Sequence, residues 1–420
     1  AMSLSVPRDF DCAGGHALLI GAGFDLFDEQ GRRIRYGDGG MEQYGFCFGG
    51  SATLCRQLAE QDWSRCRPNG PAAPQPTGLV EPYASAMEED GDRLSRAQGA
   101  WLGQLIGDAL GSQVEFLDPE GIRSRWPSGV KEIVGGGPFK TIPGQMTDDS
   151  ELASALAFSL LAQGAYDGDD VALAYRAWYR SEPFDVGATI RAALQDIRDG
   201  SPFESAARNA NRASQANGAL MRSAPLGIAG VNWTEEETIR VAGVDATLTH
   251  PNKVCVDANM IFVATVRRSI LLRQGPGDLY HYALDLAERL NVEAAVHQAL
   301  LEAKAEPPAN FLSQMGWVVI ALQNAFYELL REDSFEASIR RTVERGGDTD
   351  TNACIAGALL GSVMGASRIP TRWVERVLTC RPLDGLRDVH NARPALYWPV
   401  DALLVAEQLM HLGAKRGTGS

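Results

Sequence analysis

The sequence predicts a compact all-α domain of many helices, preceded by a small extension of mixed α/β character. Beyond residue 90, apolar residues recur at three- and four-residue spacing in one segment after another, and alternating strand-like runs are scarce. Before it, RPNGPAAPQPTGLVEP at 67–82 is rich in proline, which is typical of a semi-extended linker. With 420 residues, 45% of them hydrophobic, the chain can bury one large core.

These changes in composition predict an N-terminal extension over 1–66, a Pro-rich linker over 67–90, and a helical domain over 91–415. Within the extension, two short strands are expected around the turn DEQGR, the first ending near Phe27 and the second covering Ile34 to Tyr36. SATLCRQLAEQDW then follows as a short helix. Because a segment of this size buries little apolar core alone, we expect it to pack against the main domain or a partner.

The main domain shows the period of a helix in segment after segment. In chain order these segments are Leu94–Leu110, Leu152–Leu161, Val171–Tyr179, 186–198, Cys255–Leu272, Leu279–Leu290, Val292–Lys304, Phe311–Leu330, Asn352–Met364 and Val400–Leu412.

Two of these helices carry a small residue at every fourth position. The series are Gly99, Gly103, Gly107 and Gly111, and Ala353, Gly357, Gly361 and Gly365. A glycine inside a helix costs about 1 kcal/mol relative to alanine, so the repetition needs a cause. Close packing of the two helices along their ridges is one explanation. A wall beside a ligand, where side chains would not fit, is the other.

Composition excludes several classes of protein. The formal net charge of −14 argues against a nucleic-acid-binding surface. The longest uncharged stretch, between Asp350 and Arg368, is too short and too rich in Gly, Ser and Thr for a membrane span. Seven scattered cysteines without a C-x-x-C pair, and a beginning unlike a signal peptide, indicate reduced thiols in a cytoplasmic protein. Gly21-Ala22-Gly23 lacks the third glycine of a dinucleotide-binding loop.

Two helix starts repeat one polar pattern, TDDS at 147–150 and DTDT at 348–351. N-capping explains one acid at each start, because Asp and Thr accept free backbone N–H groups, but it explains two acids and a threonine poorly. A metal site is the alternative, since carboxylates and hydroxyls are hard oxygen ligands that suit Mg²⁺, Mn²⁺ or Ca²⁺. The residue types alone leave both interpretations open.

Three other acidic motifs do not fit. A D-x-D-x-T phosphatase nucleophile ends an apolar strand, whereas ASIRRTVERGG before Asp348 is charged and helical. An EF-hand needs a glutamate at its twelfth position, which neither segment supplies. A terpene-type synthase needs an aspartate three residues after Asp149, where Leu152 stands.

Seven motifs then follow one another over residues 93–380. They are AQGAWLGQLIGDALGSQVEF, GQMTDDSELA, FDVGATIRAAL, NGALMRSAPLGI, THPNKVCVDAN, RGGDTDTNACIAGALLGSVMGA and IPTRW. This order resembles the ADP-ribosylglycohydrolase family, which includes the dinitrogenase-reductase-activating glycohydrolases and the ADP-ribosyl-arginine hydrolases. The resemblance implies an all-α fold, two Mg²⁺ ions (or Mn²⁺), and hydrolysis of the bond between ADP-ribose and an amino-acid side chain or a related ADP-ribosyl linkage. Residues 1–85 lie outside it.

The resemblance also implies roles for single residues. The metal ligands would be Thr147, Asp148, Asp149, Asp348, Asp350 and Thr351. Glu115 matches a glutamate near the metals and the scissile bond, and we expect Glu115 or Asp149 to assist the attacking water. Asp185 matches an acid near the leaving group of the arginine-specific branch. The residues that would contact ADP-ribose are Asn217 and Gly218 at the diphosphate, His250 at the pocket, and Trp317 on the nucleoside.

The chain departs from the family pattern at Ser150, at SQANGALMR, and at Ala188, none of which is a presumed metal ligand. The expected function is removal of ADP-ribose from a modified protein, with arginine as the expected modified residue. The alternative is a binding module that docks on an ADP-ribosyltransferase, such as a toxin, through residues 1–66. Both functions can coexist in one immunity-type protein.

Overall fold

The computed structural model describes residues 2–3, 19, 25–28, 30, 32–35, 47–51, 53, 55, 91–197, 201–309 and 311–413. The chain divides into two units, Ala1–Thr77 and Gly78–Ser420. The predicted linker over 67–90 lies outside the described residues, as do Tyr36 and most of the predicted helix SATLCRQLAEQDW.

The first unit contains a three-stranded antiparallel sheet. Its strand order is β1 (Met2–Ser3), β3 (Cys47–Gly50) and β2 (Asp25–Phe27). The predicted turn after Phe27 is confirmed, because Phe27 forms an antiparallel bridge with Arg33 and Ile34 N–H donates to the Leu26 carbonyl. The sequence pattern misses β3, because CFGG is short and half glycine.

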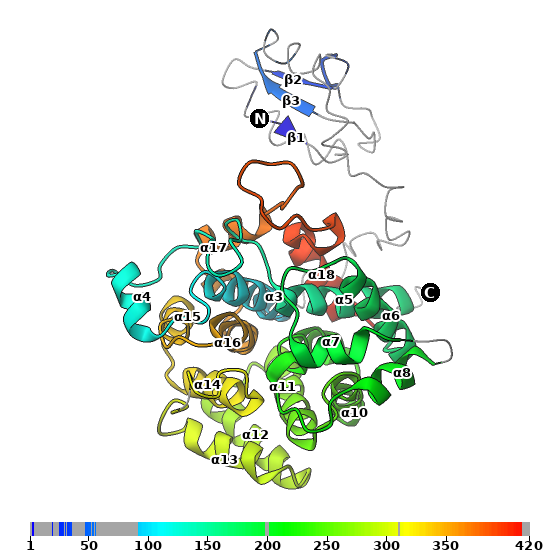
Figure 1. Cartoon of the computed structure of the whole chain (residues 1–420), viewed down its shortest axis with the longest axis vertical. Helices are drawn as coiled ribbons and strands as arrows, with labels where there is room; N and C mark the ends of the chain where they lie inside the picture. Colours follow the sequence, from blue (N-terminus) through cyan, green and yellow to red (C-terminus); the bar gives the residue numbers. More distant parts are fainter. Residues whose placement is uncertain are drawn as a thin grey trace. The chain divides into compact units, whose positions relative to one another are not determined.

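The second unit is helical, which confirms the all-α fold class (Figure 1). Its helices are α3 (Gly91–Gly111), α4 (Pro119–Arg125), α5 (Asp148–Gln163), α6 (Gly168–Arg180), α7 (Ala188–Leu194), α8 (Pro202–Asn209), η2 (Asn217–Ala219), α9 (Ala224–Ala229), η3 (Gly230–Asn232), α10 (Glu235–Thr247), α11 (Lys253–Leu272), α12 (Pro276–Arg289), α13 (Ala294–Ala303), α14 (Val318–Leu330), α15 (Phe335–Val343), α16 (Thr349–Met364), η4 (Ala366–Arg368), α17 (Thr371–Leu378), η5 (Ala395–Tyr397), η6 (Pro399–Asp401) and α18 (Ala402–His411).

Helix α14 begins later than the sequence predicts, so the predicted helix over Phe311–Leu330 is wrong in its first part. The backbone of residues 316–318 bonds to another segment instead. Asn217 N–H donates to the Gly316 carbonyl, and Val318 N–H donates to the Gln215 carbonyl. Two further differences are that α7 is shorter than predicted and that the short or polar helices α4, α8, α9, α10 and α17 are missed, whereas α15 confirms that the segment before Asp348 is helical.

Helices α3 and α16 lie side by side at the centre of the domain (Figure 1). A Cβ added at Gly103 would overlap the Gly357 carbonyl oxygen, and one at Gly361 would overlap that of Gly99. The two glycine ridges therefore face each other, and their packing explanation is confirmed. The missing side chains let two backbones approach closely.

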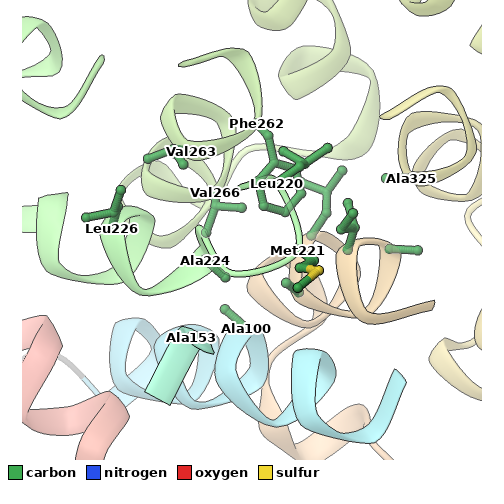
Figure 2. Close-up of a cluster of buried hydrophobic side chains, with 14 of the residues drawn as sticks. Ala100, Ala153, Leu220, Met221, Ala224, Leu226, Phe262, Val263, Val266 and Ala325 are labelled. Carbon is green, nitrogen blue, oxygen red and sulfur yellow. The ribbon is translucent and has the colours of Figure 1, made fainter. Parts of the chain in front are cut away.

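A continuous apolar core surrounds this helix pair. Figure 2 shows part of it, where Leu220, Met221 and Ala224 lie between Ala100 of α3 and Phe262 of α11. Cys55, Cys255, Cys354 and Cys380 are buried free thiols, and Cys47 is buried as well. In the described part of the chain, no helix is both long enough and apolar enough to cross a membrane.

Candidate active site

Glu115 lies near the acids at the start of α16 because backbone hydrogen bonds join the turn after α3 to the turn before α16. After α3, Phe116 N–H donates to the Gly347 carbonyl, and Gly347 N–H donates to the Leu117 carbonyl. Gly346 and Gly347 have φ of 78° and 79°, a left-handed conformation that glycine adopts without strain. The RGG sequence before Asp348 therefore allows the tight turn that aligns both segments.

Glu115, Asp348 and Asp350 form an acidic cluster. One carboxylate oxygen from each lies within 4.8 Å of the others. Burial, together with the charges of Asp185, Asp348 and Asp148, raises the pKa of Glu115 to about 10. Burial, and then the charge of Glu115, raises the pKa of Asp350 well above its usual value. Three close carboxylates of this kind form a candidate cation site, because a cation would relieve their repulsion.

The second predicted group of ligands, at the start of α5, is fixed by a residue that the sequence analysis did not single out. Asp108 of α3 is fully buried and accepts hydrogen bonds from Thr147 N–H at 3.1 Å and Ser150 N–H at 3.2 Å. Thr147 Oγ1 lies 3.1 Å from both Asp108 Oδ1 and Asp149 Oδ2. Burial raises the pKa of Asp108 to about 6.

The two groups of acids are close enough to act on each other's charge. The pKa values of Asp148 and Asp149 lie well above the usual value, through burial first and then through neighbouring carboxylates that include Asp348. Asp149 in turn raises the pKa of Asp350. The structure therefore brings the acids of the two helix starts into one electrostatic site, with Thr351 buried at its edge.

N-capping does not explain these acids. Thr147 and Asp348 occupy the N-cap positions of α5 and α16, yet neither forms a side-chain cap hydrogen bond. Burial raises the pKa of Asp348, and the hydrogen bonds that oppose this rise come first from Asn217 and only then from its own helix, at Thr351. Moreover, Glu115 Oε2 and Asp149 Oδ1 are buried without a hydrogen-bond partner among the described residues. Buried oxygens without partners are rare, and a ligand or ion would satisfy them.

A pocket adjoins this cluster. It is an open space of about 500 Å³ lined by Gln215, Ala216, Gln314, Gly316 and Trp317.

Asn217 links the pocket to the acids through its backbone N–H and its side-chain amide. Asn217 N–H bonds to the Gly316 carbonyl at 3.0 Å, while Asn217 Nδ2 donates to Asp348 Oδ2 at 2.7 Å. The indole of Trp317 donates to Gln215 Oε1 at 2.8 Å, which fixes the ring at the pocket wall.

His250 lies behind the η2 turn. It is buried, its Nδ1 is 2.8 Å from Thr249 Oγ1, and its ring would be 2.9 Å from a Cβ added at Gly218. Burial, with the charge of Arg222, lowers the pKa of His250 to about 3, so the ring is neutral near pH 7. His250 therefore supports the turn that carries Asn217.

Asp185 lies on the loop before α7, and this loop contacts α5. Gly187 N–H donates to Asp148 Oδ2 at 3.3 Å. Burial, then the charge of Asp348, raises the pKa of Asp185 to about 7, so both of its protonation states exist near neutral pH.

Sequence reasoning missed Asp108 and Gln215. The signal for Asp108 was available, because it is the one charged residue between Ala97 and Val114. An acid inside so apolar a helix is rarely without a partner. Gln215 carried no such signal, because its partner Trp317 lies far away in sequence.

Comparison with known proteins finds relatives of this chain. The family model described as ADP-ribosylglycohydrolase matches residues 89–399. An ADP-ribosylarginine hydrolase, Tri1 of Pseudomonas putida, is 28% identical over 84% of this chain and 93% of its own length. The ADP-ribosyl-[dinitrogen reductase] glycohydrolase of Rhodospirillum rubrum is 30% identical over 67% of this chain and 90% of its own length.

A solved structure gives the same result. A chain described as an ADP-ribosylglycohydrolase-related protein complex is 30% identical, with a TM-score of 0.61, over 77% of this chain and 99% of that one. The family model alone spans more than half of the sequence. The chain therefore belongs to the ADP-ribosylglycohydrolase family, whose members remove ADP-ribose by hydrolysis.

Proposed function

We propose that this protein is a metal-dependent hydrolase that removes ADP-ribose from modified arginine side chains and so reverses mono-ADP-ribosylation. The acidic cluster of Glu115, Asp348 and Asp350, joined by Asn217 to the pocket at Trp317, carries the proposal. The names of the two bacterial relatives support it, because one is an ADP-ribosylarginine hydrolase and the other acts on ADP-ribosylated dinitrogen reductase.

We propose that this donor set holds two divalent cations such as Mg²⁺ or Mn²⁺. It consists of hard oxygen donors, and two of its buried carboxylate oxygens, on Glu115 and Asp149, lack a hydrogen-bond partner among the described residues. We assign the ligand role to Thr147, Asp148, Asp149, Asp348, Asp350 and Thr351, with Glu115 beside them. Such cations would supply positive charge to orient the ribose hydroxyls and to activate a water.

The remaining chemistry falls to the chain's own groups. Cleavage of the glycosidic bond develops positive, oxocarbenium-like charge on the ribose, which the surrounding carboxylates stabilise. Glu115 or Asp149, in the ionised form that bound cations would favour, accepts the proton of the attacking water. Asp185 has a pKa of about 7 and assists the departing side chain by giving it a proton. Asn217 and Gly218 bind the diphosphate, and Trp317 packs on the nucleoside.

The test is release of free ADP-ribose from an arginine-ADP-ribosylated protein in the presence of Mg²⁺, measured by mass spectrometry of the substrate before and after treatment. We expect loss of the modification, and more than about a 100-fold fall in rate for Asp350→Asn, since loss of a ligand should exceed the effect of losing a ligand's supporting partner. Asp118→Asn is the matched control, because Asp118 caps the exposed start of α4. Failure of the wild-type protein on arginine-, serine- and nucleic-acid-linked ADP-ribose would refute the proposal.

A second function is favoured by the separate first unit of the chain, Ala1–Thr77, which lies outside the matched family model. The P. putida relative covers 84% of 420 residues, about 353, so its likeness reaches back at least to about residue 68, before the family model begins at residue 89. We propose residues 1–66 as a module that binds and blocks a cognate ADP-ribosyltransferase, which would make the protein an immunity factor in the cytoplasm. Binding of a candidate transferase to the full chain, but not to a chain that lacks residues 1–80, supports this role. Equal binding by both contradicts it.

A further inference from the structure

Two phenylalanine rings contact each other outside the apolar core. The ring centroids of Phe139 and Phe184 are 5.5 Å apart, and the ring planes are tilted by 55°. Both residues are half-buried, and neither is among the described residues that form the core or pack against it. An aromatic pair without a place in the core points to a contact with something else.

Phe139 belongs to a tight turn, residues 136–141, that packs against the end of α3 just before Glu115. A Cβ added at Gly137 would overlap the carbonyl oxygen of Ser112, three residues before Glu115. The turn therefore lies against the segment that leads from α3 into the acidic cluster.

Asn391 links the same turn to the segment before α5. Asn391 Nδ2 donates to the Phe139 carbonyl, and Gln145 Nε2 donates to the Asn391 carbonyl at 2.6 Å. Two residues further on, Arg393 forms a buried ion pair with Glu151 of α5 at 2.7 Å. These bonds fix the position of Phe139 relative to the ligand-bearing start of α5.

Phe184 approaches the site from a third direction. Asp185 follows it directly, and among the neighbouring charges that of Asp348 acts most strongly on the Asp185 carboxylate. Gly187 N–H donates to Asp148 Oδ2 at 3.3 Å, so this loop also borders the acids. The aromatic pair therefore lies where the segments that lead to Glu115, to α5 and to Asp185 converge.

We infer that Phe139 and Phe184 form the wall that recognises the guanidinium of an ADP-ribosylated arginine, and that they determine the linkage preference of the enzyme. The inference rests on the proposed function. A guanidinium is planar and weakly hydrated, stacks on aromatic faces, and pairs with a carboxylate, here that of Asp185. A neutral serine oxygen would gain from neither contact, so an aromatic and acidic wall favours arginine-linked ADP-ribose.

The experiment compares three readouts in the full chain: kcat/KM for ADP-ribosyl-arginine, kcat/KM for an ADP-ribosyl-serine peptide, and the inhibition constant of free ADP-ribose. Phe139→Leu and Phe184→Leu each keep an apolar side chain but remove the π face. We expect a fall of about fivefold to tenfold on the arginine linkage, in line with a cation–π contact. The serine linkage and the inhibition constant should change by less than about twofold. Phe139→Tyr and Phe184→Tyr should keep the wild-type activity on the arginine linkage, because tyrosine retains the aromatic face.

Phe203→Leu is the matched control, because Phe203 packs across Gly168 at the start of α6 and should leave every readout unchanged. An unchanged arginine activity in both leucine variants would overturn the inference. So would a parallel rise in the inhibition constant, which would place the rings on the ADP-ribose side. A wild-type protein that hydrolyses no linkage would count against the proposed function instead, a result that the variants cannot produce.

Discussion

The two helix starts that carry the acids are alike in sequence, yet different parts of the molecule fix them. At α5, Asp108 of the core helix α3 accepts N–H groups from Thr147 and Ser150. At α16, Asp348 accepts instead from Asn217, whose backbone also bonds to Gly316 in the pocket wall. The α5 start is therefore bonded to the core helix α3. The α16 start is bonded both to α3, through Thr349 Oγ1 and the Gly111 carbonyl, and to the wall of the pocket, through Asp348 and Asn217.

The two starts differ in their connection to the pocket. The α5 start has no hydrogen bond to the lining of the pocket among the described residues, and its partner Asp108 lies in α3. The α16 start does have such a link, because Asn217 donates to Asp348 and its backbone bonds to Gly316 of the pocket wall. Similar motifs therefore differ in whether they are connected to the pocket.

The largest expected effect comes from displacing the α16 start alone. A Cβ at Gly111 would overlap Asp350 Cα and the Thr349 carbonyl, so Gly111→Ala must shift the cluster. We expect a loss of about 1–3 kcal/mol in the free energy of unfolding. The rate should fall by about 100-fold, as for a displacement of about 1 Å. Urea unfolding and steady-state kinetics measure both.

Gly277→Ala is the control for this change, because Gly277 is also a helical glycine but has open space around its Cα. It should leave activity unchanged and stability equal or slightly higher, since alanine is the better helix former. Equal activity in both variants would show that the close approach of Gly111 to Asp350 does not control the cluster.

A smaller effect is expected from weakening the α5 start. Asp108→Asn keeps one oxygen for the backbone N–H groups but removes the charge and cannot accept from all of its present donors. We expect cation affinity to fall about 10–100-fold, as when a ligand's supporting partner is lost. Titration calorimetry with Mn²⁺ measures the affinity.

Asp257→Asn serves as the structural control, because Asp257 is also buried and also accepts a backbone N–H, that of Glu293. It should reduce stability without changing cation affinity. If both variants lose affinity equally, Asp108 acts through general stability, and the contrast between the two helix starts fails.

Much of the fold could be predicted because helix periodicity is local. The glycine ridges even indicated that α3 and α16 are neighbours, since their spacing matches on both helices. The prediction failed at 311–317, where Gly316 and Trp317 bond to residues about 100 positions earlier. No local pattern reveals such a bond.

The candidate site divides in the same way. The likeness between TDDS and DTDT is visible in sequence, whereas the hydrogen bonds that join these starts to Asp108 and Asn217 are not, because each bond links distant segments. The sequence also left capping and metal binding as alternatives, because both use the same residue types at a helix start. The structure weakens capping, since neither start is capped by its own side chain.

The last prediction concerns pH, since the acids in and around both helix starts have raised pKa values. Among those near the starts, Asp108 has a pKa of about 6, Asp185 of about 7 and Glu115 of about 10, against about 4 in an unfolded chain. Acids of this kind bind protons more tightly when folded, so their contribution is fully present below about pH 4 and is lost as pH rises through the folded values.

Protein treated with a chelator should therefore unfold at lower urea concentration at pH 8 than at pH 5. For Asp108 alone, a shift of about two pKa units corresponds to about 3 kcal/mol. Mg²⁺ at pH 8 should restore about 2.7 kcal/mol at 100 times its Kd, because it binds only the folded, ionised cluster. In Asp108→Asn the loss between pH 4 and 6 should shrink, while the loss above pH 7 from Glu115 should persist. Greater stability at pH 8 than at pH 5 without cation would mean that burial in the folded protein does not raise the pKa values of these carboxyl groups.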